Sequence, residues 1–191
     1  MALQRLAVMP SMFGVLSPCC IGNEFTAFRL HDLSDTTVIL NTSSAPAVTN
    51  TTVYVPLTVS ETITIVKGWW LNGGTVNGNV DIGLYPEAGG AKLVSLGSTA
   101  QAGTNAIQEG NIADTVVPPG RYLMAFGWSS ATATFSVLGI GDMVNVQSYK
   151  SMGVAMEATF ALPASATPIA YTLAGVPAIP IFGFSQRTLV A

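Results

Sequence analysis

Apolar and polar residues alternate through most of the chain, between short stretches rich in Gly, Asn and Pro. Thr, Val and Ile dominate the alternating stretches, which is typical of β-strands because branched side chains fit a pleated sheet. The pattern predicts strands at residues 36–40, 52–59, 62–71, 79–85, 92–98, 105–112, 120–128 and 133–138. Short strands at this regular spacing predict an all-β fold, an antiparallel β-sandwich of jelly-roll type.

One face of the strand at 120–128 is apolar throughout. Tyr122, Met124, Phe126 and Trp128 share this face, because alternate residues of a strand point to the same side of the sheet. We expect this strand at the centre of the core. Tight turns are predicted between the strands, as at Asn77-Gly78, because Asn and Gly tolerate a positive φ.

Three regions of the chain differ in character. Residues 1–34 lack clear periodicity and are interpreted as an N-terminal arm or irregular strands, whereas residues 35–162 carry the sandwich, with further strand-like stretches at 143–149 and 153–162. Residues 163–191 form a Pro-rich tail, which must pack on the sandwich or on a neighbouring subunit because exposed apolar side chains promote aggregation. The candidate oligomer or shell contacts in this tail are Ile179, Ile181, Phe182 and Phe184. Deletion of 169–191 is expected to leave the sandwich folded but to dissociate the oligomer.

Charged residues are unusually rare. The 191 residues include 7 Lys and Arg and 10 Asp and Glu, so 9% are charged, against about 25% in an average soluble protein. Hydrophobic residues make up 49%, which excludes intrinsic disorder. So few cations argue against binding to nucleic acid or to anionic lipid. A surface this poor in charge is expected to be covered by partners, which favours an obligate component of an assembly.

Two long segments without charge, 122–141 and 158–186, do not predict membrane spans. The first is interrupted by Ser, Thr and Gly, and the second contains Pro163, Pro168, Pro177 and Pro180, which would break a spanning helix. The first residues only weakly imitate a secretory signal, because Pro10 cuts the apolar stretch short. We expect an uncleaved chain made in the cytoplasm.

The residues suited to catalysis do not form a motif. His31 is the single histidine and lies beside Asp32, without a nucleophile motif to accompany it. The carboxylates are scattered, so a pair such as Glu61 and Glu109 could form only through folding. Cys19 and Cys20 are adjacent and lack the spacing of a zinc site. The sequence therefore predicts no enzyme, no cofactor and no metal.

Trp69 and Trp70 are adjacent in the strand at 62–71, so their side chains should point to opposite faces. One should enter the core, and the other should point outward beside Asn72, Asn77 and Asn79. An aromatic face stacks on the C–H groups of a sugar and amides bind its hydroxyls, so these residues are a candidate glycan or partner contact. The alternative is that a second sheet, the arm or another subunit covers the outward Trp.

The middle of the chain carries a family resemblance in three segments: Tyr54-Val55-Pro56-Leu57-Thr58-Val59, Val80-Asp81-Ile82-Gly83-Leu84-Tyr85 and Pro118-Pro119-Gly120-Arg121-Tyr122. Together they resemble the jelly-roll-like β-sandwich of small virion proteins of tailed bacteriophages. That family includes capsid decoration or cement proteins and tail-fibre or receptor-binding modules. No catalytic residue comes with the resemblance.

The resemblance implies a structural function in the virion. A cement protein buries much of its surface against the major capsid protein and against its own copies, which suits a chain with little charge. We therefore expect a non-enzymatic decoration protein that stabilises the shell as a homo-oligomer, and the resemblance implies a trimer. The alternative is a tail-fibre or receptor-binding protein that recognises a host-surface glycan.

Overall fold

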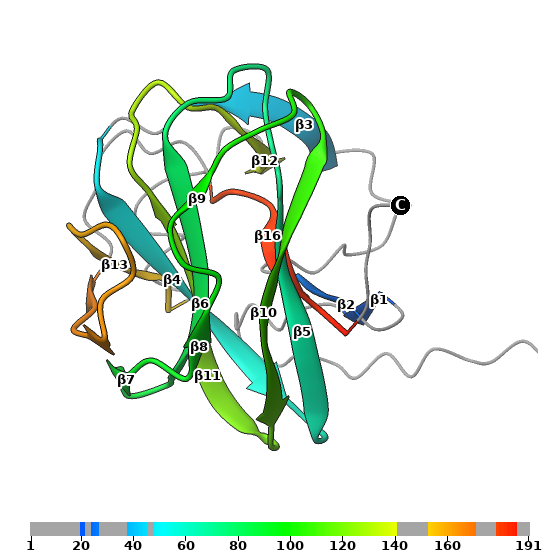
Figure 1. The fold of residues 1–191 in the computed structure, drawn as a ribbon, viewed down its shortest axis with the longest axis vertical. Helices are drawn as coiled ribbons and strands as arrows, with labels where there is room; N and C mark the ends of the chain where they lie inside the picture. The colour runs from blue at the N-terminus through cyan, green and yellow to red at the C-terminus, as the bar shows by residue number, and fades with distance from the viewer. Residues whose placement is uncertain are drawn as a thin grey trace, which may run out of the picture.

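The computed structural model describes residues 20–21, 24–26, 38–45, 48–140, 153–170 and 179–186. The strand expected at 143–149, His31 and Cys19 lie outside these ranges. The described part is all-β, and its strands pair in antiparallel sheets consistent with a β-sandwich (Figure 1). No helix in the described ranges is long and apolar enough to cross a membrane. The predicted fold class is confirmed, while the jelly-roll connectivity stays a prediction.

The larger of the two main sheets has seven strands in the described part. Its order is β15 (Ile169–Ala170), β13 (Ala155–Glu157), β4 (Thr51–Val59), β11 (Gly120–Trp128), β6 (Asn79–Pro86) and β8 (Val94–Ser95), with β9 (Thr99–Ala100) also on β6. β11 is central, as its apolar face predicts, and it pairs along its whole length with β4.

The second sheet has five strands. Its order is β1 (Cys20–Ile21), β2 (Glu24–Thr26), β16 (Phe182–Ser185), β5 (Ile63–Leu71) and β10 (Ile107–Val117). Two small sheets complete the described part, one of β3 (Val38–Ser44) with β12 (Phe135–Ile140) and one of β7 (Gly90–Ala91) with β14 (Ser165–Ala166).

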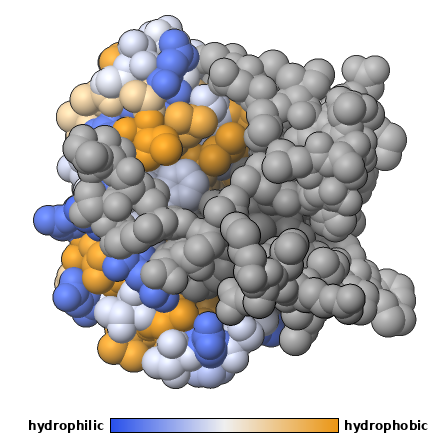
Figure 2. Space-filling model, turned by 90° about the vertical axis from the view of Figure 1, so that its right-hand side faces the viewer, coloured by the Kyte–Doolittle hydropathy of each residue, from blue (hydrophilic) through white to orange (hydrophobic). Residues whose placement is uncertain are grey.

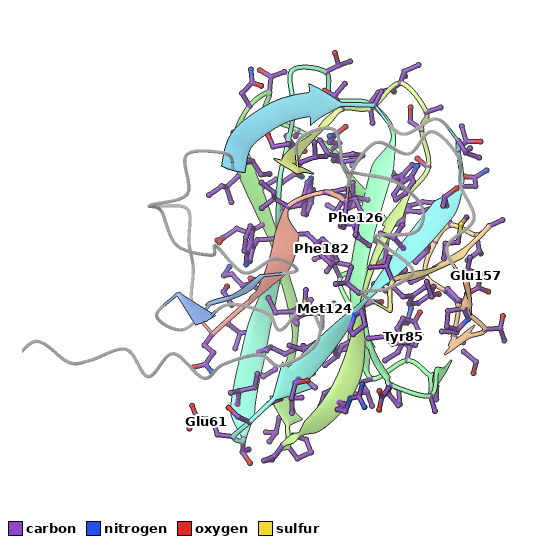
Figure 3. The ribbon with its side chains drawn as sticks, turned by 180° about the vertical axis from the view of Figure 1, so that it is seen from behind. Glu61, Tyr85, Met124, Phe126, Glu157 and Phe182 are labelled. Carbon is purple, nitrogen blue, oxygen red and sulfur yellow. The ribbon has the colours of Figure 1, made fainter. Side chains whose placement is uncertain are left out.

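The main core lies between the two large sheets. Tyr122, Met124, Phe126 and Trp128 all belong to it, which confirms that they share an inward face. The ring of Phe126 lies 5.0 Å from that of Phe182, so the core joins the centre of one sheet to β16 of the other (Figure 3). Aromatic contacts of this kind add to the stability gained from burial alone.

β16, in the predicted tail, is part of this core, which is the first of the two alternatives expected for the tail. β16 pairs with β5 on one side and with β2 on the other. Ile179, Phe182 and Phe184 are at most 1% exposed within their own chain, and Ile181 is partly buried against the same core. The sandwich itself buries Ile179, Phe182 and Phe184, so these three are not available as contacts to another subunit or a shell, whereas such a contact at Ile181 stays a prediction.

Several strands differ in extent from the predicted ones. The stretch 92–98 contains only the short strand β8, and Gly97, with a φ of 80°, separates it from β9, which follows the stretch. The strand expected at 105–112 continues to Val117, and its register shifts between Asn111 and Thr115 as in a β-bulge. The polar residues of the bulge hid the second half of this strand from a simple alternation pattern.

Residues 153–168 cover part of the outer face of the seven-stranded sheet, and we call this segment the strap. Its Leu162 and Ala166 form a second, smaller core with Tyr54, Tyr85, Leu123 and Ala125. The packing is close at Gly83, where an added Cβ would lie 2.6 Å from Leu162 Cδ1. Figure 3 places Tyr85 and Glu157 on this side, away from the main core. The strand expected at 153–162 is therefore reduced to β13.

Candidate functional site

The residues expected to bind a glycan lie at and beyond the end of β5. Trp70 and Asn72 are both fully buried, at 0% exposure. Trp70 Nε1 donates a hydrogen bond to Asn72 Oδ1 at 2.7 Å, and Gln101 Nε2 donates to the same oxygen at 2.9 Å. These two site residues therefore satisfy each other inside the fold and are not available to a sugar.

Asn72 also ties two loops together. Its Nδ2 donates to the carbonyl oxygen of Ala102 at 2.6 Å and to Gln108 Oε1 at 3.1 Å. Gln101 Oε1 accepts a hydrogen bond from the backbone N–H of Asn77 at 2.7 Å. Buried amides satisfied in this way fix a loop conformation, because any unpaired member would carry a large desolvation cost. The network is a structural scaffold for this end of the sandwich.

Trp69 lies on the opposite face of β5 from Trp70, as strand alternation predicts. It is only 7% exposed, and its Nε1 has no hydrogen-bond partner among the described residues. The outward tryptophan is therefore covered rather than displayed. Neither tryptophan offers an open aromatic face, which corrects the expectation of a sugar-stacking platform.

The two remaining candidates, Asn77 and Asn79, lie nearer the surface. Asn77 is exposed and donates from Nδ2 to Thr132 Oγ1 at 2.6 Å, while Asn79 is half-buried and donates to Ser98 Oγ at 2.8 Å. The loops at 72–78 and 129–134 contain no charged residue. This end of the sandwich thus presents amides and hydroxyls that are already bonded to one another.

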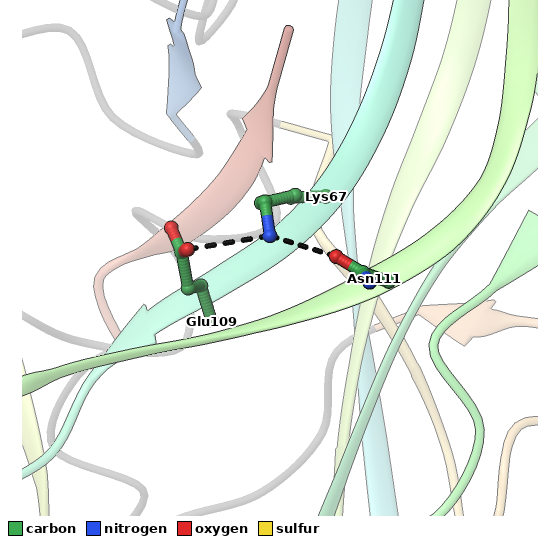
Figure 4. A network of polar contacts seen from close by, with 3 residues as sticks. All are labelled: Lys67, Glu109 and Asn111. Carbon is green, nitrogen blue, oxygen red and sulfur yellow. Dashed lines mark hydrogen bonds and ion pairs between the residues drawn. The ribbon is translucent and has the colours of Figure 1, made fainter. Parts of the chain in front are cut away.

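A polar cluster that the sequence did not indicate lies on the outer face of the five-stranded sheet (Figure 4). Lys67 Nζ is 3.4 Å from Glu109 Oε1 and donates to Asn111 Oδ1 at 2.7 Å. Lys67 comes from β5 and the other two residues from β10. Lys67 is far from Glu109 and Asn111 in sequence, so only the strand register could have predicted that the three side chains meet.

A second buried polar group anchors the strap. Asp81, 1% exposed, accepts a hydrogen bond from the N–H of Gly97 at Oδ1 (2.9 Å) and from the N–H of Leu162 at Oδ2 (3.2 Å). Burial raises the pKa of Asp81 above its ordinary value, and these backbone donors and the charge of Lys92 partly oppose the rise. The carboxylate holds the strap and the turn at Gly97 to β6.

Two tyrosines reinforce the same attachment. Tyr85 donates from its hydroxyl to the carbonyl oxygen of Pro163 at 2.6 Å, and Tyr54 donates to Glu157 Oε2 at 2.7 Å. Burial raises the pKa of both phenols, and the hydrogen bond to Glu157 adds to the rise at Tyr54. Both hydroxyls therefore act as fixed donors and not as proton-transfer groups near neutral pH.

The carboxylates considered as a catalytic pair are not brought together. Glu109 pairs with Trp69 near the end of β5, whereas Glu61 precedes the first residue of this strand. At about 3.3 Å per residue, a separation of this length far exceeds the reach of two acids acting on one bond. Among the described residues, no group of three or more His, Cys, Asp and Glu side chains could hold a metal ion.

On the face shown in Figure 2, hydrophobic and hydrophilic residues of the described part lie side by side. Val116 is 63% exposed and Ile107 is 43% exposed, and these two residues lie at opposite ends of β10. β10 is an edge of its sheet, with β5 as its strand partner in the described part. It is therefore a long edge strand with an apolar side chain exposed near each end.

Comparisons of the chain with protein-family models, with curated proteins and with solved structures find no match.

Proposed function

We propose that this chain is a non-enzymatic structural protein that works by associating with copies of itself and with other proteins. The observation that carries this proposal is the scarcity of charge available to solvent. Among the described residues, Lys67 pairs with Glu109, Asp81 is buried, and the exposed Arg121 and Glu87 neutralise each other in an ion pair of 2.7 Å. A surface with so little free charge is suited to being covered.

The edge strand β10 supports the same proposal. An unpaired edge offers backbone N–H and C=O groups to another strand, and proteins usually protect such edges with charge or with cover. The bulge between Asn111 and Thr115 and the exposed Asp114 protect the middle of β10, whereas the exposed Val116 and Ile107 leave its two ends unprotected. A neighbouring copy of this chain is the occupant we propose for the edge, because contact with it would remove the exposed Val116 and Ile107 from water.

The resemblance to virion sandwiches gives this function its specific form. We propose a capsid decoration or cement protein of a tailed bacteriophage, located in the virion and bound to the major capsid protein as a homo-oligomer, with a trimer expected. The glycan-binding alternative loses support, because its two tryptophans are buried.

The test is the location and copy number of the protein in purified particles. Quantitative mass spectrometry should find this chain in numbers comparable to the major shell protein, and labelled antibodies should decorate the head in electron micrographs. Label confined to the tail of the phage particle would contradict the cement function. Absence of the chain from particles would overturn the virion assignment altogether.

A further inference from the structure

The cluster of Lys67, Glu109 and Asn111 contains an ion pair and, beside it, an amide group that an amine can attack. The amine of Lys67 lies 2.7 Å from Asn111 Oδ1, the oxygen of the amide carbonyl, and 3.4 Å from Glu109 Oε1 (Figure 4). An amine is a nucleophile, an amide carbonyl carbon is an electrophile, and a carboxylate can carry protons between them. The three groups therefore form a complete set for acyl transfer to the lysine.

The strand register holds these groups in place. Lys67 is the direct cross-strand partner of Asn111, and Glu109 lies two residues away on the same face of β10. Directly opposed residues of an antiparallel pair have Cβ atoms about 4.5 to 5.5 Å apart. The amine and the amide are thus kept together by the backbone of two paired strands, which removes much of the entropic barrier to a reaction between them.

The amine and the carboxylate are largely shielded from solvent. The side chains of Lys67 and Glu109 are only 17% and 11% exposed. Trp69, which is the cross-strand partner of Glu109, is itself buried. The two groups are therefore held beside each other with little access for water.

We propose that Lys67 and Asn111 become joined by an intramolecular isopeptide bond, with Glu109 as the catalytic proton carrier. Glu109 takes a proton from the Lys67 ammonium, and the neutral amine attacks Cγ of Asn111. The nitrogen–carbon bond forms, Glu109 returns the proton to the amide nitrogen, and the Cγ–Nδ2 bond breaks. One ammonia is released and takes up the second proton of the lysine as ammonium, so atoms and charge balance without oxidant or cofactor.

Asn111 is exposed, so the ammonia leaves directly into solvent and the reaction runs to completion. The bond would fasten the edge strand β10 to β5 beside the bulge that interrupts their pairing. This inference is independent of the proposed function, because it concerns only groups within one chain.

Intact-mass spectrometry of the purified full-length chain tests the proposal. The wild-type protein should weigh less than its sequence by one ammonia. Lys67→Arg, Asn111→Ala and Glu109→Gln should each have the full mass of their own sequences. Lys67→Arg is the sharpest change, since arginine keeps the positive charge but stays protonated and cannot attack. Lys92→Ala is the matched control and should keep the deficit, because Lys92 Nζ donates to the backbone oxygen of Leu162.

Cyclisation at an Asn-Gly pair such as Asn77-Gly78 also releases ammonia, so the site of the deficit matters. Tandem mass spectrometry should find a branched peptide joining Lys67 to Asn111, which survives mild alkali, whereas a cyclic imide is hydrolysed by it. A wild-type chain of full mass after prolonged incubation would overturn the proposal. A deficit that persists in Lys67→Arg, or the absence of the branched peptide, would overturn it equally, whatever the stability of the variants.

Discussion

Asp81 shows how one residue can join three elements. Its two carboxylate oxygens take the N–H groups of Gly97 and Leu162, so the side chain links β6 to a turn and to the strap. Both donors would be unpaired without it. An unsatisfied buried donor costs about 1 to 3 kcal/mol, which makes Asp81 more important for the strap than its charge suggests.

Asp81→Ala should lower the free energy of unfolding by about 2 to 4 kcal/mol, because it leaves both donors without an acceptor. Denaturation by urea at neutral pH would measure this loss. Asp114→Ala is the matched control: Asp114 is exposed on β10, so the change should stay within about 0.5 kcal/mol. Equal effects of the two substitutions would contradict the anchoring role.

The free energy of unfolding of the wild type and that of Asp81→Ala should also depend differently on pH. Burial raises the pKa of Asp81 in the folded state, so folding takes up a proton at acidic pH. The stability advantage of the wild type over Asp81→Ala should therefore grow as the pH falls from neutral through the folded pKa toward about 4. An advantage that shrinks over this interval would show that the backbone donors, and not burial, determine the direction of the pKa shift of Asp81.

At the scale of elements, β16 is the strand on which the five-stranded sheet depends. It lies between β2 and β5, and its Phe182 and Phe184 enter the main core. The tail is rich in Pro and Ala up to β16, yet β16 itself is an interior strand of the sheet. Its removal would take away the pairing of β2 as well as two aromatic side chains of the core.

Phe182→Ala should destabilise the chain by about 3 to 5 kcal/mol, the usual cost of deleting a buried aromatic ring. The ring is 0% exposed and lies 5.0 Å from that of Phe126. Thermal and urea unfolding measure the effect, and Val116→Ala, at 63% exposure, is a control with little expected change. Deletion of 169–191 should unfold the sandwich rather than merely dissociate it. A folded truncated chain would contradict the place of β16.

The sequence predicted the strands of the seven-stranded sheet well, because β4, β6 and β11 alternate cleanly and are bounded by Gly, Asn or Pro. It also predicted that Trp69 and Trp70 face opposite sides. Which surface covers an apolar residue, however, depends on pairings distant in sequence. The burial of Trp69 and the interior position of Phe184 could not be derived for that reason. The Lys67 cluster depends on the register of β5 and β10 and was equally hidden.

At the scale of the whole molecule, the described charges are mostly engaged within the chain. Four large apolar side chains of the described part are exposed, and two of them, Val116 and Ile107, lie on the edge strand β10, while Val48 and Leu93 lie elsewhere. We therefore expect the copies to meet along β10 and to leave the strap side free.

Val116→Lys should therefore dissociate the oligomer, because a lysine on an edge strand opposes pairing with another strand. Light scattering coupled to size-exclusion chromatography would record the change in mass. Ser60→Lys, which adds the same charge in an exposed turn, is the matched control and should leave the assembly intact. If both variants keep the wild-type mass, the copies meet elsewhere; if the wild type is a monomer at every concentration, the proposed homo-oligomer fails.

The position of β16 also has a consequence for how the protein is made. β2 is synthesised early, yet its neighbours in the sheet are β1 and β16, the last strand of the described part. During translation β1 and β2 must wait, with no link to β5, until β16 has left the ribosome. Completion of this sheet is therefore a late step, and a chain stalled before β16 would expose the faces that this strand normally closes.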